Sequence, residues 1–157
     1  MKYAIAFAIL ALVVVGCSRY RGQRSARQYA EQIERSNHRL THLNRALSRF
    51  NERTRKAAEA KLYLKDDVFP RFESYLDTLK AIACDDPELQ GIHKLLVDEH
   101  SQLFDALKHF DEGLDDKNLA QRIKELKAVV RRTRSAQTEY QVKVRAYYAK
   151  YGLKTEK

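Results

Sequence analysis

The feature that most constrains the fold is a repeat of apolar residues at intervals of three and four. In the N-terminal half it falls on Leu40, Leu43, Leu47, Phe50, Thr54, Ala57, Leu64 and Val68, with Lys61 as the break. Residues at this spacing share one face of an α-helix. Strand-like alternation is absent, and only 5 glycines and 2 prolines interrupt the 157 residues. The chain is therefore predicted to be all-α.

Start and stop signals divide the first half of this pattern. The first helix is expected from about Ser25 to about Lys65. At residues 66–70 either a second helix begins, with Asp67 as its N-cap and a proline in its first turn, or the first helix bends. The second helix is expected to end near Cys84. Whether the two are continuous is left open by the sequence.

Two more helices follow. Asp86 and Pro87 form a start signal for a third helix that ends near Gly113. A capping box of Asn118 and Gln121 predicts a last helix that reaches about Gly152. Short loops make sequential helices antiparallel neighbours. The prediction is an elongated antiparallel bundle of three or four helices with coiled-coil-like seams, and an uncovered seam on the first helix would favour self-association or a partner.

The N-terminal residues have the pattern of a targeting signal. Lys2 precedes an apolar run at residues 4–15, AIAFAILALVVV. Its 12 residues fall short of the roughly 20 that a membrane-spanning helix needs, and they suit the apolar region of a signal peptide. Val14-Val15-Gly16-Cys17 resembles the lipobox of bacterial lipoproteins.

This resemblance implies cleavage before Cys17, diacylglycerol on its thiol and a further acyl chain on its amine. Two or more acyl chains anchor a protein stably to a membrane. Ser18, where aspartate would mark retention at the inner membrane, implies the periplasmic leaflet of the outer membrane. The chain then divides into a removed signal peptide, a lipidated basic tether, a helical bundle and a charged C-terminal tail, at residues 1–16, 17–24, 25–152 and 153–157.

Charge is sorted along the chain, whose formal net charge is +9. Residues 18–65 carry 13 basic and 4 acidic groups, residues 66–116 carry 4 and 14, and residues 117–157 carry 12 and 3. A basic stripe borders the apolar seam of the first helix at Arg35, Arg39, His42, Arg45, Arg49, Arg53 and Lys56. The last helix has a similar stripe at Lys124, Lys127, Arg131 and Arg134.

Two interpretations of the stripes follow. The favoured one is internal: charges beside a seam select the neighbouring helix and its orientation, and each exposed pair contributes about 0–1 kcal/mol. The other is a surface for anionic envelope lipid, lipopolysaccharide or glycan. An exported lipoprotein does not meet chromosome or ribosome, so nucleic acid is not expected as a partner.

Residues that could carry chemistry are few. His38 and His42 project from one helical face, but a pair without a third ligand predicts no metal site. His93 and His100 are expected at the boundary of the acidic third helix, with pKa values raised by nearby carboxylates. If Cys17 is lipidated, Cys84 has no internal disulfide partner and is expected to be a quiet thiol. No nucleophile or phosphate-binding loop is recognisable, so no catalysis, cofactor or metal is predicted.

Aromatic residues gather near the end of the last helix. Tyrosine serves both in cores and as an interface anchor, because its ring buries while its hydroxyl stays hydrated. The candidate anchors are Tyr140, Tyr147, Tyr148 and Tyr151. The expected function is a non-enzymatic helical module that binds an envelope protein, as an adaptor, pilot or assembly factor. The alternative is a binder of anionic envelope lipid or polymer.

Overall fold

The computed structural model describes the backbone of residues 2–53 and 55–153 and the side chains of residues 20–51 and 55–153. Within these residues every regular element is helical, which confirms the all-α prediction. The elements are α1 (Lys2–Arg53), α2 (Ala57–Tyr63), the π-helix η1 (Leu64–Val68), α3 (Phe69–Lys80), α4 (Pro87–Asp111) and α5 (Leu119–Lys150). Because α2, η1 and α3 follow one another without a gap, they form one rod.

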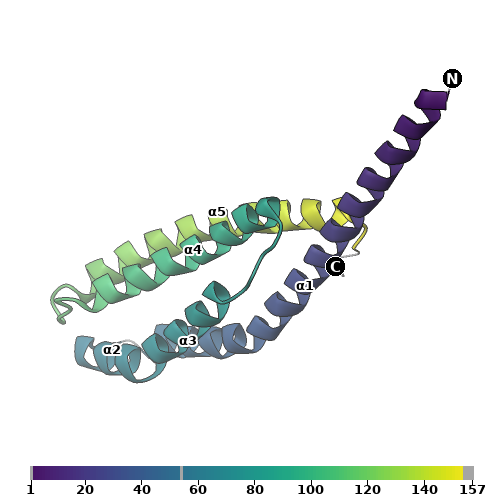
Figure 1. Cartoon of the computed structure of the whole chain (residues 1–157). Coiled ribbons are helices and arrows are strands. Elements are labelled where there is room, and N and C mark those ends of the chain that lie inside the picture. The colour runs from purple at the N-terminus through teal and green to yellow at the C-terminus, as the bar shows by residue number, and fades with distance from the viewer. Residues whose placement is uncertain (1, 54, 154–157) are drawn as a thin grey trace.

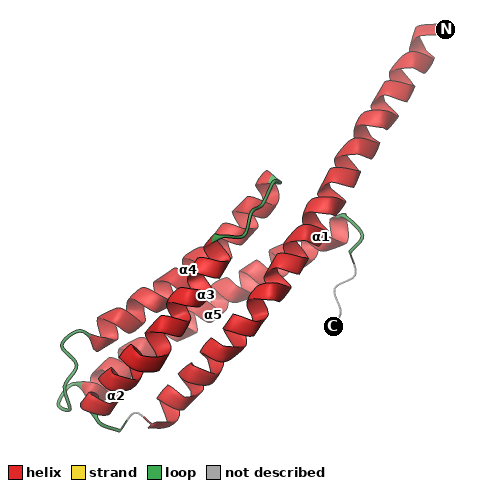
Figure 2. Ribbon diagram, turned by 60° about the horizontal axis from the view of Figure 1, so that its bottom comes forward, coloured by secondary structure: helices red, strands yellow, loops and turns green. Residues whose placement is uncertain are grey.

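The rods build an elongated helical bundle (Figures 1 and 2). Helix α4 lies antiparallel to α5, and α3 lies against α1. Further contacts join α3 to α4 and α1 to α5. The N-terminal part of α1 extends beyond the bundle, as both views show.

The core follows the predicted seams. In the N-terminal half, Leu43, Leu64 and Val68 are at most 1 % exposed, and Lys61 is exposed as the break in the repeat predicts. Phe104 and Leu107 continue the core along α4. The seam of residues 40–68 is therefore confirmed for the side chains that the structure describes, although it is divided among α1, α2 and η1.

The predicted end of the first helix near Lys65 is wrong. Helix α1 ends at Arg53, and α2 begins at Ala57 after Lys56 has adopted an extended conformation, with φ −129° and ψ 146°. The Ala57 backbone N–H donates to Asp116 Oδ1 at 2.7 Å. That carboxylate lies in the loop between α4 and α5 and caps α2 from a distant part of the sequence. A local pattern could not contain this signal.

The predicted start near Ser25 is also wrong. Helix α1 runs from Lys2 without interruption, and Gly22 is buried. The ring of Tyr151, from the end of α5, occupies the space that a Cβ on Gly22 would fill. Helix α1 therefore continues through residue 24, where the predicted tether meets the predicted bundle. Of the predicted tail, only Leu153 lies within the described residues.

At residues 66–70 the rod continues through a wider turn. The Phe69 N–H donates to Leu64 O, five residues back, and Pro70 follows in the first turn of α3. A proline within a regular α-helix clashes with the carbonyl four residues earlier, and the π-turn relieves this clash. Asp67 is not an N-cap, which excludes one of the two predicted alternatives, a new helix that begins here. It accepts hydrogen bonds from Tyr63 Oη at 2.7 Å and Arg71 Nε at 2.6 Å.

The predicted limits of the third and last helices are confirmed. Asp86 caps α4 by accepting from the N–H groups of Glu88 at 2.8 Å and Leu89 at 3.2 Å. Gly113 and Gly152 follow α4 and α5 with φ of 65° and 74°, a region that glycine enters without strain.

Two local predictions in the C-terminal half are wrong. Asn118 precedes α5, but its side chain makes no capping bond to that helix. It instead accepts from the Asp115 N–H at 3.0 Å and donates to Gly113 O at 2.9 Å. The second helix ends at Lys80, short of Cys84, and the amide of Gln32 on α1 holds the loop that follows. Its Oε1 accepts from the Ala83 N–H and its Nε2 donates to Ala83 O, both at 3.3 Å.

Candidate functional site

A buried chain of hydrogen bonds joins all four rods at the centre of the bundle. Tyr29 Oη on α1 lies 3.1 Å from Tyr140 Oη on α5 and 3.1 Å from His93 Nδ1 on α4. His93 Nε2 lies 3.0 Å from the carbonyl oxygen of Leu79 in α3. Tyr29 is 1 % exposed, and both of its partners are also buried.

The carbonyl oxygen of Leu79, at the end of this series of hydrogen bonds, fixes the direction of all of them. A carbonyl oxygen only accepts, so His93 Nε2 donates to Leu79 O. Burial lowers the pKa of His93, and the imidazole is therefore neutral, with a lone pair on Nδ1. Tyr29 then donates to His93, and Tyr140 donates to Tyr29. The prediction that carboxylates raise the pKa of His93 is wrong: desolvation lowers this pKa, and what opposes it is the hydrogen bond to Leu79 O.

A second group of buried polar side chains lies two helical turns further along. It consists of three buried residues, each seven positions from a residue of the Tyr29–His93–Tyr140 hydrogen-bond chain: Ser36, His100 and Thr133. The Tyr75 and His100 rings meet edge to face, with centroids 5.2 Å apart. His100 Nδ1 lies 2.8 Å from Leu96 O.

Burial also sets the pKa values of this group. It lowers the pKa of His100, so the predicted increase is wrong here too. Glu99 is 7 % exposed, and its Oε2 has no hydrogen-bond partner within the described part of the chain. Burial raises the pKa of Glu99 to about 7. Below about pH 7, and above the pKa values of His93 and His100, these buried ionisable groups are therefore uncharged.

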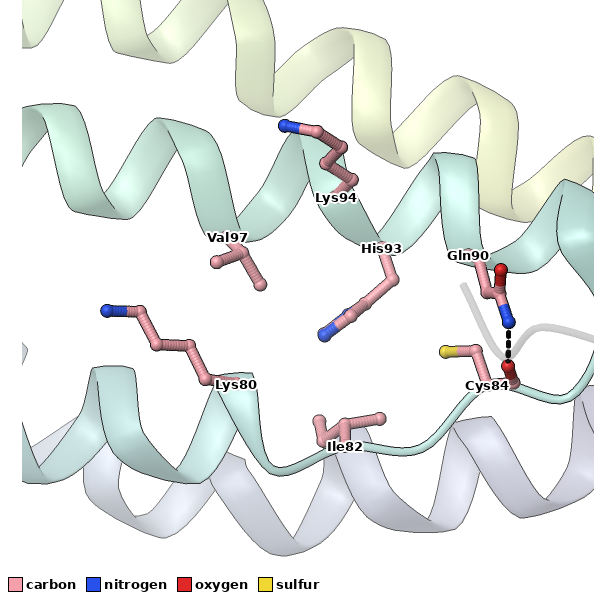
Figure 3. Close-up of a pocket in the computed structure, with 7 residues that line it drawn as sticks. All are labelled: Lys80, Ile82, Cys84, Gln90, His93, Lys94 and Val97. Carbon is pink, nitrogen blue, oxygen red and sulfur yellow. Dashed lines mark hydrogen bonds between the residues drawn. The ribbon is translucent and has the colours of Figure 1, made fainter.

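An open cavity of about 350 Å³ lies beside His93, between the end of α3, the following loop and α4 (Figure 3). Its lining is Lys80, Ile82, Cys84, Gln90, His93, Lys94 and Val97. Burial, followed by the charges of Asp85 and Asp86, raises the pKa of Cys84 to about 11. A thiol with this pKa is protonated at neutral pH and is a poor nucleophile or metal ligand. The geometry fits the predicted quiet thiol.

The tyrosines proposed as anchors have different surroundings. Tyr140 and Tyr147 are 8 % and 1 % exposed, so in the folded chain they have the core position that was one of the two roles expected for them. Tyr148 and Tyr151 are partly buried. The rings of Tyr147 and Tyr151 pack with centroids 4.9 Å apart. The tyrosine side chains at this end of α5 are therefore largely covered by other residues of the same protein.

The predicted basic stripe on α1 faces solvent. Arg35, Arg39, Arg45, Arg49 and Lys56 are exposed, whereas the side chains of Arg53 and Cys17 lie outside the described residues. Arg35 Nη2 is 4.0 Å from Glu31 on its own helix. Arg39 Nη1 donates to Ser74 Oγ on α3.

Few ion pairs join the basic helices to the acidic middle. Among the described side chains, the one ion pair between different helices joins Lys150 Nζ on α5 to Glu88 Oε2 on α4, at 2.6 Å. Basic α1 also contacts basic α5, and α3 contacts acidic α4. The larger contacts, however, are those of basic α5 with acidic α4 and of basic α1 with α3. Because few ion pairs form across them, most of the described basic side chains remain available to a partner.

His38 and His42 form a close pair on the exposed side of α1. Their Nε2 atoms are 3.2 Å apart and their ring centroids 4.4 Å apart. Within the described residues, no group of three His, Cys, Asp or Glu side chains is arranged to hold a metal ion. None of the helices in the described residues is both long and apolar enough to cross a membrane.

No family model, curated protein or solved structure matches the chain. The important residues that sequence reasoning missed are Tyr29, Gln32 and Asp116. Their partners are 51 to 111 residues away, so spacing along a single helix gives no signal for them.

Proposed function

We propose that this protein is a lipid-anchored cell-envelope lipoprotein that acts as a non-enzymatic adaptor through its basic helical face. The signal-peptide pattern ending at Cys17 supports the location, with the acylated cysteine in the periplasmic leaflet of the outer membrane. The observation that carries the binding role is the exposure of the basic residues on α1, whose one ion pair among the described side chains joins Arg35 to Glu31 on the same helix.

The partner most compatible with this face is an envelope protein with an acidic surface. Arginine is enriched in protein interfaces because its planar guanidinium binds carboxylates through two parallel hydrogen bonds. The large apolar side chains exposed within the described residues, Tyr20, Leu62 and Val142, lie on three different helices. They offer no continuous apolar patch, which favours a partner held by charge.

The anionic headgroups of lipid or lipopolysaccharide are the second candidate. The same exposed arginines support it, and a lipid anchor would hold them near a membrane surface, where each basic group contributes about 1 kcal/mol. Both candidates predict binding that weakens as salt screens the charges. Only the identity of the captured molecule separates them.

The test is crosslinking of the tagged chain in cells, followed by mass spectrometry of what co-purifies. We expect a discrete, stoichiometric protein that is lost in Cys17→Ala and reduced in the double variant Arg35→Gln/Arg45→Gln. Lys94→Gln/Lys108→Gln is the matched control, because it removes the same charge from α4. Recovery of lipid, lipopolysaccharide or glycan alone would replace the adaptor with the second candidate. If the same molecules co-purify with the Cys17→Ala variant, the proposed lipid anchor is contradicted.

A further inference from the structure

We propose that His38 and His42 form a binding site for a divalent transition-metal ion such as Zn²⁺, Cu²⁺ or Ni²⁺. The Nε2 atoms of the two rings are 3.2 Å apart. Two imidazole nitrogens bound to one tetrahedral Zn²⁺ at about 2.0–2.1 Å lie about 3.3 Å from each other. The two atoms that would bind the ion are thus already at nearly the required separation.

The backbone explains why the rings meet in this way. Residues four apart project from one face of a helix, one turn above the other. The same spacing holds the two zinc-binding histidines of the His-Glu-x-x-His motif, in which the glutamate is the general base. Here the sequence between the rings is Arg-Leu-Thr, so the pair keeps the ligand spacing without the base. A binding role fits this composition, and a hydrolytic one does not.

Both rings are accessible and available. His38 is exposed and His42 is partly buried, and within the described residues each ring forms one hydrogen bond, the contact between the two Nε2 atoms. That contact needs one nitrogen to accept, so the two rings are not both protonated.

The surroundings set the kind of site. Arg45 on α1 and Arg71 on α3 are close enough to affect His42 and would repel a cation, so the affinity should be modest. Because no third protein ligand lies nearby among the described residues, the other coordination positions would hold water or a ligand from outside. Neutral imidazole favours borderline ions, with Cu²⁺ bound more tightly than Zn²⁺, and disfavours Mg²⁺.

The experiment is a calorimetric titration of the full chain in detergent with Zn²⁺ and, separately, with Cu²⁺ and Mg²⁺. We expect one Zn²⁺ or Cu²⁺ per chain and no heat from Mg²⁺. His38→Ala and His42→Ala should each weaken binding by about 10- to 100-fold, because one nitrogen then has to hold the ion alone. His109→Ala, which removes an exposed histidine from α4, is the matched control and should leave the affinity unchanged.

Two results would overturn the proposal. One is Zn²⁺ affinity in the double variant His38→Ala/His42→Ala equal to that of the unmodified chain. The other is an imidazole NMR spectrum of the unmodified chain in which Zn²⁺ leaves the His38 and His42 signals in place. The NMR measurement involves no substitution, so it decides the question even if a variant folds poorly. Neither result would affect the proposed adaptor, whose test depends on Cys17 and the arginines.

Discussion

Glu99 places an ionisable carboxyl in the interior, and its pKa of about 7 links the stability of the fold to pH. The usual pKa of this group, 4.5, is lower, so the folded state holds the proton more tightly than the unfolded state does. Its contribution to stability is therefore present below about pH 4.5 and is lost as the pH rises to about 7. Above that pH the buried carboxylate is charged, and it lowers the stability of the folded state.

Replacing Glu99 by glutamine should remove this cost. Glu99→Gln is expected to raise the free energy of unfolding at about pH 8 by up to about 3 kcal/mol and to change it little at about pH 5. Urea unfolding at the two pH values measures this. Glu73→Gln, at an exposed position on α3, is the control. An equal effect at both pH values would show that ionisation is not the cause.

His93 and His100 act at the acidic side of this range. Burial lowers their pKa values below 6.5, so the unfolded state takes up protons first as the pH falls. They therefore lower the free energy of unfolding as the pH falls below about 6.5, which is opposite in direction to the effect of Glu99.

The hydroxyl of Tyr29 has two buried hydrogen-bond partners, and removing it would leave both of them buried without that hydrogen bond. Tyr29→Phe leaves His93 Nδ1 without its donor and Tyr140 without its acceptor. A buried polar group that loses its partner costs about 1–3 kcal/mol, so we expect a loss in this range in chemical unfolding. Tyr20→Phe is the control, since Tyr20 is 70 % exposed. Equal stability of the two variants would mean that the chain of hydrogen bonds contributes nothing.

The limits of sequence reasoning are clear at these residues. Tyr140 falls on an apolar repeat, so its core position was one of the two outcomes predicted for it. Tyr29 meets His93 and Tyr140 across 64 and 111 residues, and no local spacing encodes that meeting. The pKa of His93 was predicted in the wrong direction because sequence shows neighbouring charges but does not show the depth of burial.

Among the elements, α1 and α5 are coupled where Tyr151 packs on Gly22. In a free helix Gly→Ala stabilises by about 1 kcal/mol, because alanine loses less backbone entropy. At this position the added methyl would overlap the tyrosine ring. We therefore expect Gly22→Ala to destabilise the chain by about 1–3 kcal/mol.

A double-mutant cycle separates the two effects. In the Tyr151→Ala background the ring is gone, and Gly22→Ala should stabilise by up to about 1 kcal/mol. Thermal unfolding of the four chains gives the sign in each background. The same sign in both would mean that the ring does not control the approach of α1 to α5.

Helix limits were predictable where both partners of a cap are close in sequence. Asp86 accepts from residues two and three positions later, and that start was predicted correctly. The start of α2 was missed because Asp116 is 59 positions from Ala57. The bend at residues 66–70 was one of the predicted alternatives, but its π-turn depends on how Pro70 is accommodated within a continuous rod.

For the whole molecule, charge is sorted by helix: α1 and α5 are basic, whereas α4 is acidic. Charges on the basic helices should therefore contribute most to binding an anionic surface. On a cation-exchange column, Arg35→Gln/Arg45→Gln should elute at lower salt than Lys94→Gln/Lys108→Gln. Both variants lose the same net charge, so identical elution would show that the column senses total charge only.

The cap that Asp116 provides for Ala57 also has a consequence for the order of events in biosynthesis. A ribosome releases the N-terminal half first, when the carboxylate that completes α2 has not yet been made. The partners of Tyr29 on α4 and α5 are equally late. Folding that depends on such distant contacts is slow compared with that of bundles held by local ones. The nascent chain should therefore remain unfolded until most of its length has been synthesised, which is the state that translocation across a membrane requires.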